Sequence, residues 1–113
     1  MKLVVVVLNR VECLEEILEE FGNNGFHGAT IIDSRGMAQS LYGHDELRFM
    51  ASLRVLLDPS HRENKTIFMV LEDSQVDLAY DIVNRVTGGL DKPDTGILFT
   101  LPVDRIEGIK ENK

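Results

Sequence analysis

The stretch Gly28–Gln39, GATIIDSRGMAQ, decides how the rest of the chain is interpreted. Thr30–Ile32 are β-branched, which is typical of a strand with a half-buried surface. Asp33–Gly36 then interrupt the apolar pattern with charges and a glycine. The next run typical of a strand, KTIFMVL, begins only at Lys65. The sequence therefore predicts a second strand, a long excursion of the chain, and then a third strand.

The part of the chain before this stretch predicts a strand and a helix. Leu3–Leu8 are apolar without interruption, as in a strand central to its sheet. Apolar residues then recur every three or four positions over Val11–Phe21, opposite a glutamate-rich face, which predicts an amphipathic helix. Asn9 is expected to be its N-cap with Glu12 as the reciprocal partner. The glycines of Gly22–Gly25 are expected to end the helix.

The part after the excursion predicts the same order again. The third strand is expected over Lys65–Leu71 and the fourth over Gly96–Leu101. A short edge strand is expected over Val103–Ile109. Between the third and fourth strands a helix is expected to end at Gly88-Gly89, with its apolar face formed by Val76, Ala79, Tyr80, Val83 and Val86.

This order, strand-helix-strand twice with a long connection between, predicts one α+β domain over residues 1–113. The pattern is that of a ferredoxin-like βαββαβ sandwich, with a four-stranded antiparallel sheet and both helices on one face. Because the strands are apolar at nearly every position, the face without helices would expose more apolar surface than monomers usually do. A symmetric homo-oligomer that buries this face is the expected remedy.

Composition excludes several classes of function. The chain has 113 residues and a net charge of −7, with no basic run, so binding to nucleic acid is not expected. The apolar run at Leu3–Leu8 is too short for a signal peptide or a membrane span. The single cysteine, Cys13, fits a reducing compartment and is expected to be a small buried residue in a cytoplasmic protein. No spacing typical of a catalytic triad or paired carboxylates occurs, so an enzyme is not expected.

Three segments resemble the PII-type nitrogen-regulatory signalling proteins. A strand that ends in a basic residue, glycine and an apolar residue is matched by Arg35-Gly36-Met37. The stretch Thr87–Phe99, TGGLDKPDTGILF, resembles the family's glycine-containing loop and fourth strand, and LPVDRIEGI resembles its closing segment. The resemblance implies a cytosolic homotrimer with ligand clefts between subunits that typically bind an adenine nucleotide. It also implies that residues 37–64 signal ligand state, and nitrogen status in that family, to a target transporter or enzyme.

The resemblance also supplies a set of candidate ligand-binding residues. Gly36 is expected to be the hinge where the chain leaves the sheet, and the glycines of the later loop would allow close approach of the backbone to a ligand. Where that family has a Gly-Lys just before the fourth strand, this chain has Asp94-Thr95-Gly96-Ile97, without a lysine. A nucleotide with fewer phosphates than ATP, or another small anion, is therefore the expected ligand. The candidate residues are Thr30, Arg35, Gly36, Met37, Gln39, Lys65, Gly88, Gly89, Thr95, Gly96, Arg105 and Lys110.

Several alternatives remain open at this point. Residues 45–57 have apolar side chains at helical spacing, so they are expected to form a helix that packs on its own assembly or docks on a partner protein. A CutA-like trimer that binds a divalent metal or has a structural role is the alternative function. His27, His44 and His61 share no spacing typical of metal ligands. A regulatory module of the ACT type is disfavoured by the length of the excursion.

Overall fold

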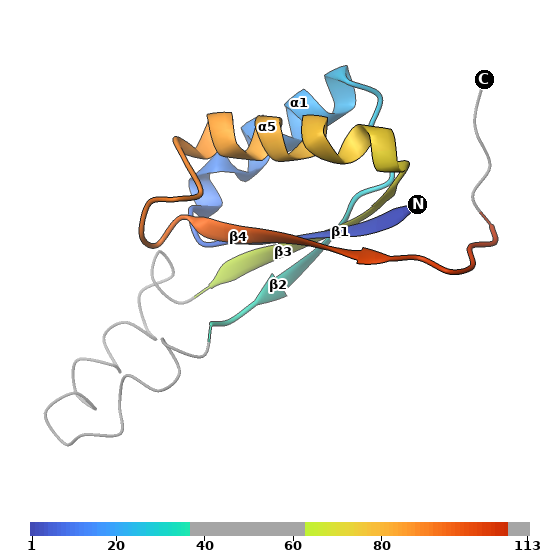
Figure 1. The fold of residues 1–113 in the computed structure, drawn as a ribbon. Coiled ribbons are helices and arrows are strands. Elements are labelled where there is room, and N and C mark those ends of the chain that lie inside the picture. The colour runs from blue at the N-terminus through green and yellow to red at the C-terminus, as the bar shows by residue number, and fades with distance from the viewer. Residues whose placement is uncertain (37–62, 109–113) are drawn as a thin grey trace, which may run out of the picture.

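The chain forms a four-stranded sheet with two helices across one of its faces (Figure 1). The computed structural model describes residues 1–36 and 63–108. All three neighbouring strand pairs are antiparallel and follow the order β2-β3-β1-β4, which confirms the expected ferredoxin-like α+β fold. The strands are β1 (Lys2–Leu8), β2 (Thr30–Ser34), β3 (Asn64–Leu71) and β4 (Gly96–Pro102).

The core lies between the sheet and the helices and follows the alternation of side chains along the two central strands. Val4, Val6 and Leu8 of β1 point to the helices and are fully buried. Cross-strand neighbours in β3 continue the same layer, because Val4 pairs with Met69 and Val6 with Ile67. The other half of the apolar positions in β1 must therefore point to the opposite face.

Helix α1 (Leu14–Asn23) begins later than the sequence predicts. A short 3₁₀ turn, Val11–Cys13, precedes it, and Asn9 is not its N-cap. The expected capping box with Glu12 is wrong because the side chain of Asn9 is used elsewhere: its Oδ1 accepts a hydrogen bond of 3.3 Å from Nδ2 of Asn64 in β3. A tertiary contact has replaced the local one.

Helix α5 (Val76–Thr87) ends at Gly88 as predicted, with Gly88 in the left-handed conformation at φ 87°. Its core residues are Ala79, Ile82 and Val83, whereas Tyr80 is 43% exposed. The expectation that Tyr80 belongs to the apolar face is wrong. Successive helical residues are rotated by about 100°, which carries Tyr80 away from the stripe centred on Ala79.

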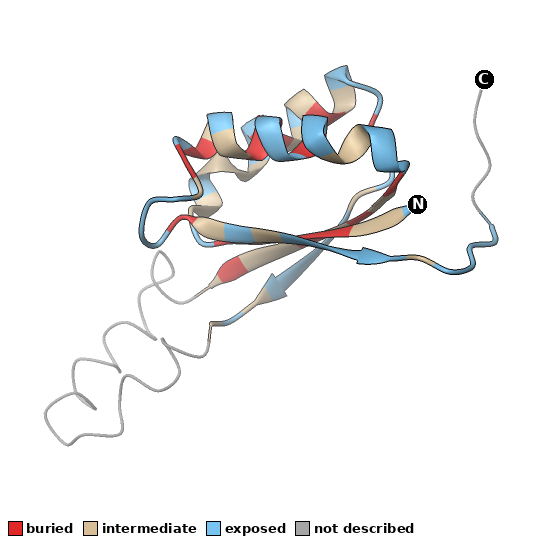
Figure 2. Cartoon of the chain, in the orientation of Figure 1, coloured by how far each residue is buried: buried red, intermediate tan, exposed pale blue. Residues whose placement is uncertain are grey.

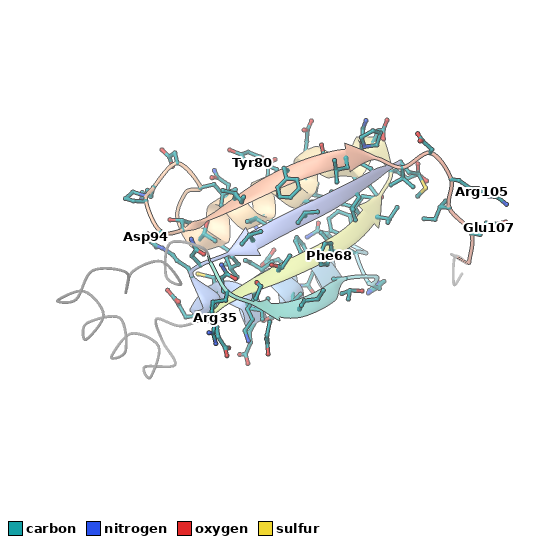
Figure 3. The ribbon with its side chains drawn as sticks, turned by 90° about the horizontal axis from the view of Figure 1, so that it is seen from below. Arg35, Phe68, Tyr80, Asp94, Arg105 and Glu107 are labelled. Carbon is teal, nitrogen blue, oxygen red and sulfur yellow. The ribbon has the colours of Figure 1, made fainter. Side chains whose placement is uncertain are left out.

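The face of the sheet opposite the helices is apolar, and no helix among the described residues covers it. We call this surface the open face; Figure 3 views the sheet from this side, with Phe68 near its middle. Exposure is greatest along the edge strands, where β2 and β4 are mostly pale blue in Figure 2. Ile97 is 57% exposed, Phe99 43% and Leu101 47%. The cross-strand register places these on the open face with Leu3, Val5, Val7, Thr30, Ile32, Thr66, Phe68 and Val70.

The segment after β4 is not the short edge strand that the sequence predicts. Val103 N donates one hydrogen bond of 3.2 Å to the Met1 carbonyl, and no strand is assigned over Asp104–Gly108. The described chain offers no neighbouring strand beyond Met1 for these residues to pair with. They run away from the body of the sheet as an exposed arm (Figure 1).

Gly96 is required by the close approach of β4 to β1. A Cβ built on Gly96, at φ 150°, would lie 2.6 Å from the Val7 carbonyl oxygen. We expect Gly96→Ala to lower the free energy of unfolding by about 2 kcal/mol or more, because backbone must shift at the edge of the core. Chemical denaturation measures this change. Gly28→Ala, where no atom lies within 4 Å, is the control and should be nearly neutral; equal losses for the two variants would contradict the packing argument.

Candidate functional site

The loops that carry most of the predicted site residues meet at one end of the sheet, which we call the loop end. Leu8, the last residue of β1, pairs with Gly96 on one side and with Lys65 on the other. Ser34, the last residue of β2, pairs with Asn64. Arg35 and Asp94 lie at this end in Figure 3, from segments about sixty residues apart in sequence.

The glycine loop, Gly88–Thr95, forms one side of the loop end. Gly88 and Gly89 have positive φ angles of 87° and 129°, which favour glycine over any other residue. The guanidinium Nη1 of Arg10 and the ammonium Nζ of Lys92 lie 3.9 and 4.0 Å from the point where a Cβ of Gly88 would be. Two cations therefore lie beside Gly88, while a carboxylate oxygen of Asp91 lies 2.6 Å from the corresponding point at Gly89.

One of these cations, the Arg10 guanidinium, already has a hydrogen-bond partner within the chain. Arg10 Nη1 donates a hydrogen bond of 3.1 Å to the Thr87 carbonyl, at the carboxyl end of α5 where the helix dipole is negative. Asp91 and Asp94 are exposed in the same loop. The site can thus balance a small anion, whereas a triphosphate would require more cationic partners than this end supplies.

Lys65 is close to the loop end but is paired within the chain. Its ammonium group contacts the carboxylate of Asp33 and lies 3.7 Å from that of Glu63. The hydrogen bond to Asp33 is the main reason that the pKa of Lys65 is raised. A ligand at this position would have to compete with an existing ion pair.

Thr95 has a structural role in this chain. The residue is 1% exposed, and its hydroxyl donates a hydrogen bond of 3.3 Å to the Pro93 carbonyl. Its own carbonyl accepts from the backbone N–H groups of Asn9 and Arg10, at 3.0 and 3.2 Å. Thr95 therefore fixes the base of the glycine loop to the end of β1, and its hydroxyl points into the fold.

Two other predicted site residues lie away from the loop end. Thr30 begins β2 and pairs with Phe68 across the open face. Arg105 lies on the exposed arm at the opposite end of the sheet, where its guanidinium is 3.2 Å from the carboxylate of Glu107 (Figure 3). At the loop end the single chain thus brings together Arg35, Gly36, Lys65, Gly88, Gly89, Thr95 and Gly96. Outside the described residues lie Met37, Gln39, Lys110 and the helix expected at residues 45–57.

Three residues of the loop end are not identified from the sequence: Asn9, Arg10 and Asn64. Asn9 fits the local pattern of a helix cap, and no sequence pattern around Arg10 indicates a site. Asn64 could have been found from strand alternation, since it shares a face with Thr66 and Phe68 yet is polar and only 6% exposed. A buried amide on an apolar face needs hydrogen-bond partners, which points to residues on adjacent strands.

The alternative of a metal site gains no support from the described part of the chain. Within residues 1–36 and 63–108, no three His, Cys, Asp or Glu side chains come together so as to hold a metal ion. His27 is exposed, and His44 and His61 lie outside the described residues.

No protein-family model matches the chain, and no curated protein sequence matches it. None of the helices in the described residues is long and apolar enough to cross a membrane.

The reactivity of the Cys13 thiol gives a test of the local electrostatics beside the loop end. Its half-buried Sγ lies 3.7 Å from the Val86 carbonyl, and burial, followed by the nearby carboxylate of Glu12, raises the pKa of the thiol above its usual value. We expect alkylation by iodoacetamide at pH 8 to be several-fold slower in the folded protein than in denaturant, because less thiolate is present. Mass spectrometry follows the rate. Equal rates in the folded and denatured protein would contradict the raised pKa.

Proposed function

We propose that the chain is a PII-like regulator that assembles as a homotrimer and binds a small, adenine-nucleotide-like ligand at clefts between subunits. The segment of residues 37–64 would report ligand state to a partner protein, such as a transporter or an enzyme. The observation that carries the proposal is the open face: an apolar surface on a sheet that has the exit of β2 and the glycine loop at the same end.

The case for assembly rests on the exposure of large apolar side chains. Ile97, Phe99 and Leu101 of β4 are each more than 40% exposed and lie on one face. Leaving such a surface in water is unfavourable by roughly 25 cal/mol for each Å². Because a closed symmetric assembly buries the same surface of every copy, it removes this cost without requiring a different partner.

Arg105 supports clefts between copies. It lies beyond the far end of β4, a strand of seven residues that spans about 20 Å. It cannot reach the glycine loop of its own chain while β4 stays paired with β1. If Arg105 contributes to a ligand site at the loop end, as the family resemblance implies, it must do so from a second copy.

The ligand class follows from the charges at the loop end. Arg10, Arg35 and Lys92 make no ion pair with any carboxylate among residues 1–36 and 63–108, whereas Lys65 is paired. The Arg10 guanidinium also donates a hydrogen bond to the Thr87 carbonyl at the end of α5. This inventory matches one or two phosphate groups better than three. A cytoplasmic regulator of this kind would need no catalytic residues.

Assembly is tested with two aromatic residues of equal exposure. Phe99 on the open face and Tyr80 on α5 are both 43% exposed. We expect Phe99→Lys to weaken self-association at least roughly a hundredfold, because burying an unpaired ammonium in an apolar interface is unfavourable by several kcal/mol. Size-exclusion chromatography with light scattering measures the mass. Tyr80→Lys is the matched control and should leave the mass unchanged; dissociation by both variants or by neither would contradict an interface on the open face.

Ligand binding is tested by thermal unfolding with AMP, ADP and ATP. We expect AMP or ADP at 100 times its Kd to add about 2.7 kcal/mol to the free energy of unfolding, and ATP at equal concentration to add less. Lys92→Ala should reduce the shift in Tm. Lys2→Ala, which removes the same charge at the opposite end of β1, should not. The sensing role fails if none of the three nucleotides raises Tm, or if the two variants have equal effects.

A further inference from the structure

A line of hydrogen bonds crosses all four strands at the loop end. Ser34 Oγ, at the end of β2, donates to Asn64 Oδ1 at the start of β3. Asn64 Nδ2 donates to Asn9 Oδ1, 3.3 Å away, just after β1. The backbone N–H of Asn9 donates to the Thr95 carbonyl, 3.0 Å away, just before β4. These bonds follow the strand order β2-β3-β1-β4, and we call this line the polar bridge.

Asn64 is the centre of the polar bridge. It is 6% exposed on a face that is otherwise mostly apolar, and its side chain uses its oxygen toward β2 and its nitrogen toward β1. In this orientation both ends of the amide are satisfied, whereas a flip of Asn64 alone would set its oxygen against Asn9 Oδ1, acceptor against acceptor. Asn64 therefore holds Ser34 and Asn9 at fixed positions relative to each other.

The two ends of the polar bridge are the two sides of the candidate site. Ser34 is followed directly by Arg35 and Gly36, the last residues described before residues 37–62. Thr95 ends the glycine loop. Arg10 strengthens that end, since its backbone N–H donates to the Thr95 carbonyl and its side chain to the Thr87 carbonyl.

We propose that Asn64 is a positioning residue that couples the exit of β2 to the glycine loop. A ligand that fixes the glycine loop would then also stabilise one position of Arg35 and Gly36, and a partner that holds the 37–64 segment would act on the glycine loop in return. The meaning of this coupling rests on the proposed function. The coupling itself is a property of the fold and is tested without any ligand.

The experiment is amide hydrogen exchange on the full chain, resolved by residue. In Asn64→Ala we expect the amides of Asn9, Arg10 and the glycine loop to exchange roughly two- to tenfold faster than in the wild type. These amides are separated from Asn64 by one strand or more, so the effect would have to pass through the polar bridge. Asn64→Asp keeps the size of the side chain and the acceptor for Ser34 but removes the donor to Asn9. It should show the same acceleration in the glycine loop.

Thr66→Val is the matched control. The Thr66 hydroxyl lies 2.7 Å from Ser34 Oγ on the same face, but no hydrogen bond joins it to Asn9. Its effect should be confined to β2 and the start of β3. Core amides of β1 report global unfolding and should not change in any variant that shows the specific effect.

The reciprocal variant is Asn9→Ala, which should accelerate exchange at Arg35 and Gly36. Combined with Asn64→Ala, it should add nothing further at the glycine loop, because both substitutions break the same bond. The coupling is refuted if Asn64→Asp alters exchange only in β2 and β3, or if Thr66→Val accelerates the glycine loop equally. If no nucleotide stabilises the wild type but Asn64→Asp accelerates the glycine loop, the sensing role fails and the coupling stands.

Discussion

The structure depends on one mismatch: the sheet is apolar on both faces, and the helices cover only one. In β1 the even-numbered residues Val4, Val6 and Leu8 are buried in the core that the sheet forms with α1 and α5. The odd-numbered residues, Leu3, Val5 and Val7, are equally apolar and point to the open face. Both central strands have this character, so no rearrangement of the two helices could bury both faces. The proposed assembly is the response to that constraint.

The same sheet explains why most residues of the candidate site lie at one end. Antiparallel pairing in the order β2-β3-β1-β4 brings the exit of β2, the end of β1 and the start of β4 to the loop end. There the open face changes from apolar to polar, at Ser34, Asn64 and Asn9. In the proposed assembly the apolar part would be buried between copies, while the polar part orders the loops. Function, as we propose it, arises where the two meet.

Periodic features of the sequence predicted the fold well, because they depend on neighbours in the chain. Alternation and helical spacing located four strands and two helices within a few residues, and Gly88 ends α5 as expected. Features that depend on distant partners were predicted poorly. Asn9 satisfies the local rule for a helix cap, yet its side chain accepts a hydrogen bond from Asn64, fifty-five residues away in sequence. Val103–Ile109 is composed like a strand, but within Val103–Gly108 it has no strand to pair with.

The candidate site was predicted in part for the same reason. Glycines with unusual backbone angles are recognisable from sequence, and Gly88, Gly89 and Gly96 all have positive φ. Which cations surround them is decided by tertiary structure: Arg10 approaches the glycine loop from the other half of the chain, and Lys65 is held by Asp33.

Sedimentation equilibrium of the wild-type protein at dilute concentration tests most directly whether the open face is buried between copies. We expect a single species with three times the chain mass of 12.7 kDa, persisting on dilution to low micromolar concentrations. A stable species of one chain mass under those conditions would show that this apolar surface tolerates water, and would refute its burial between copies.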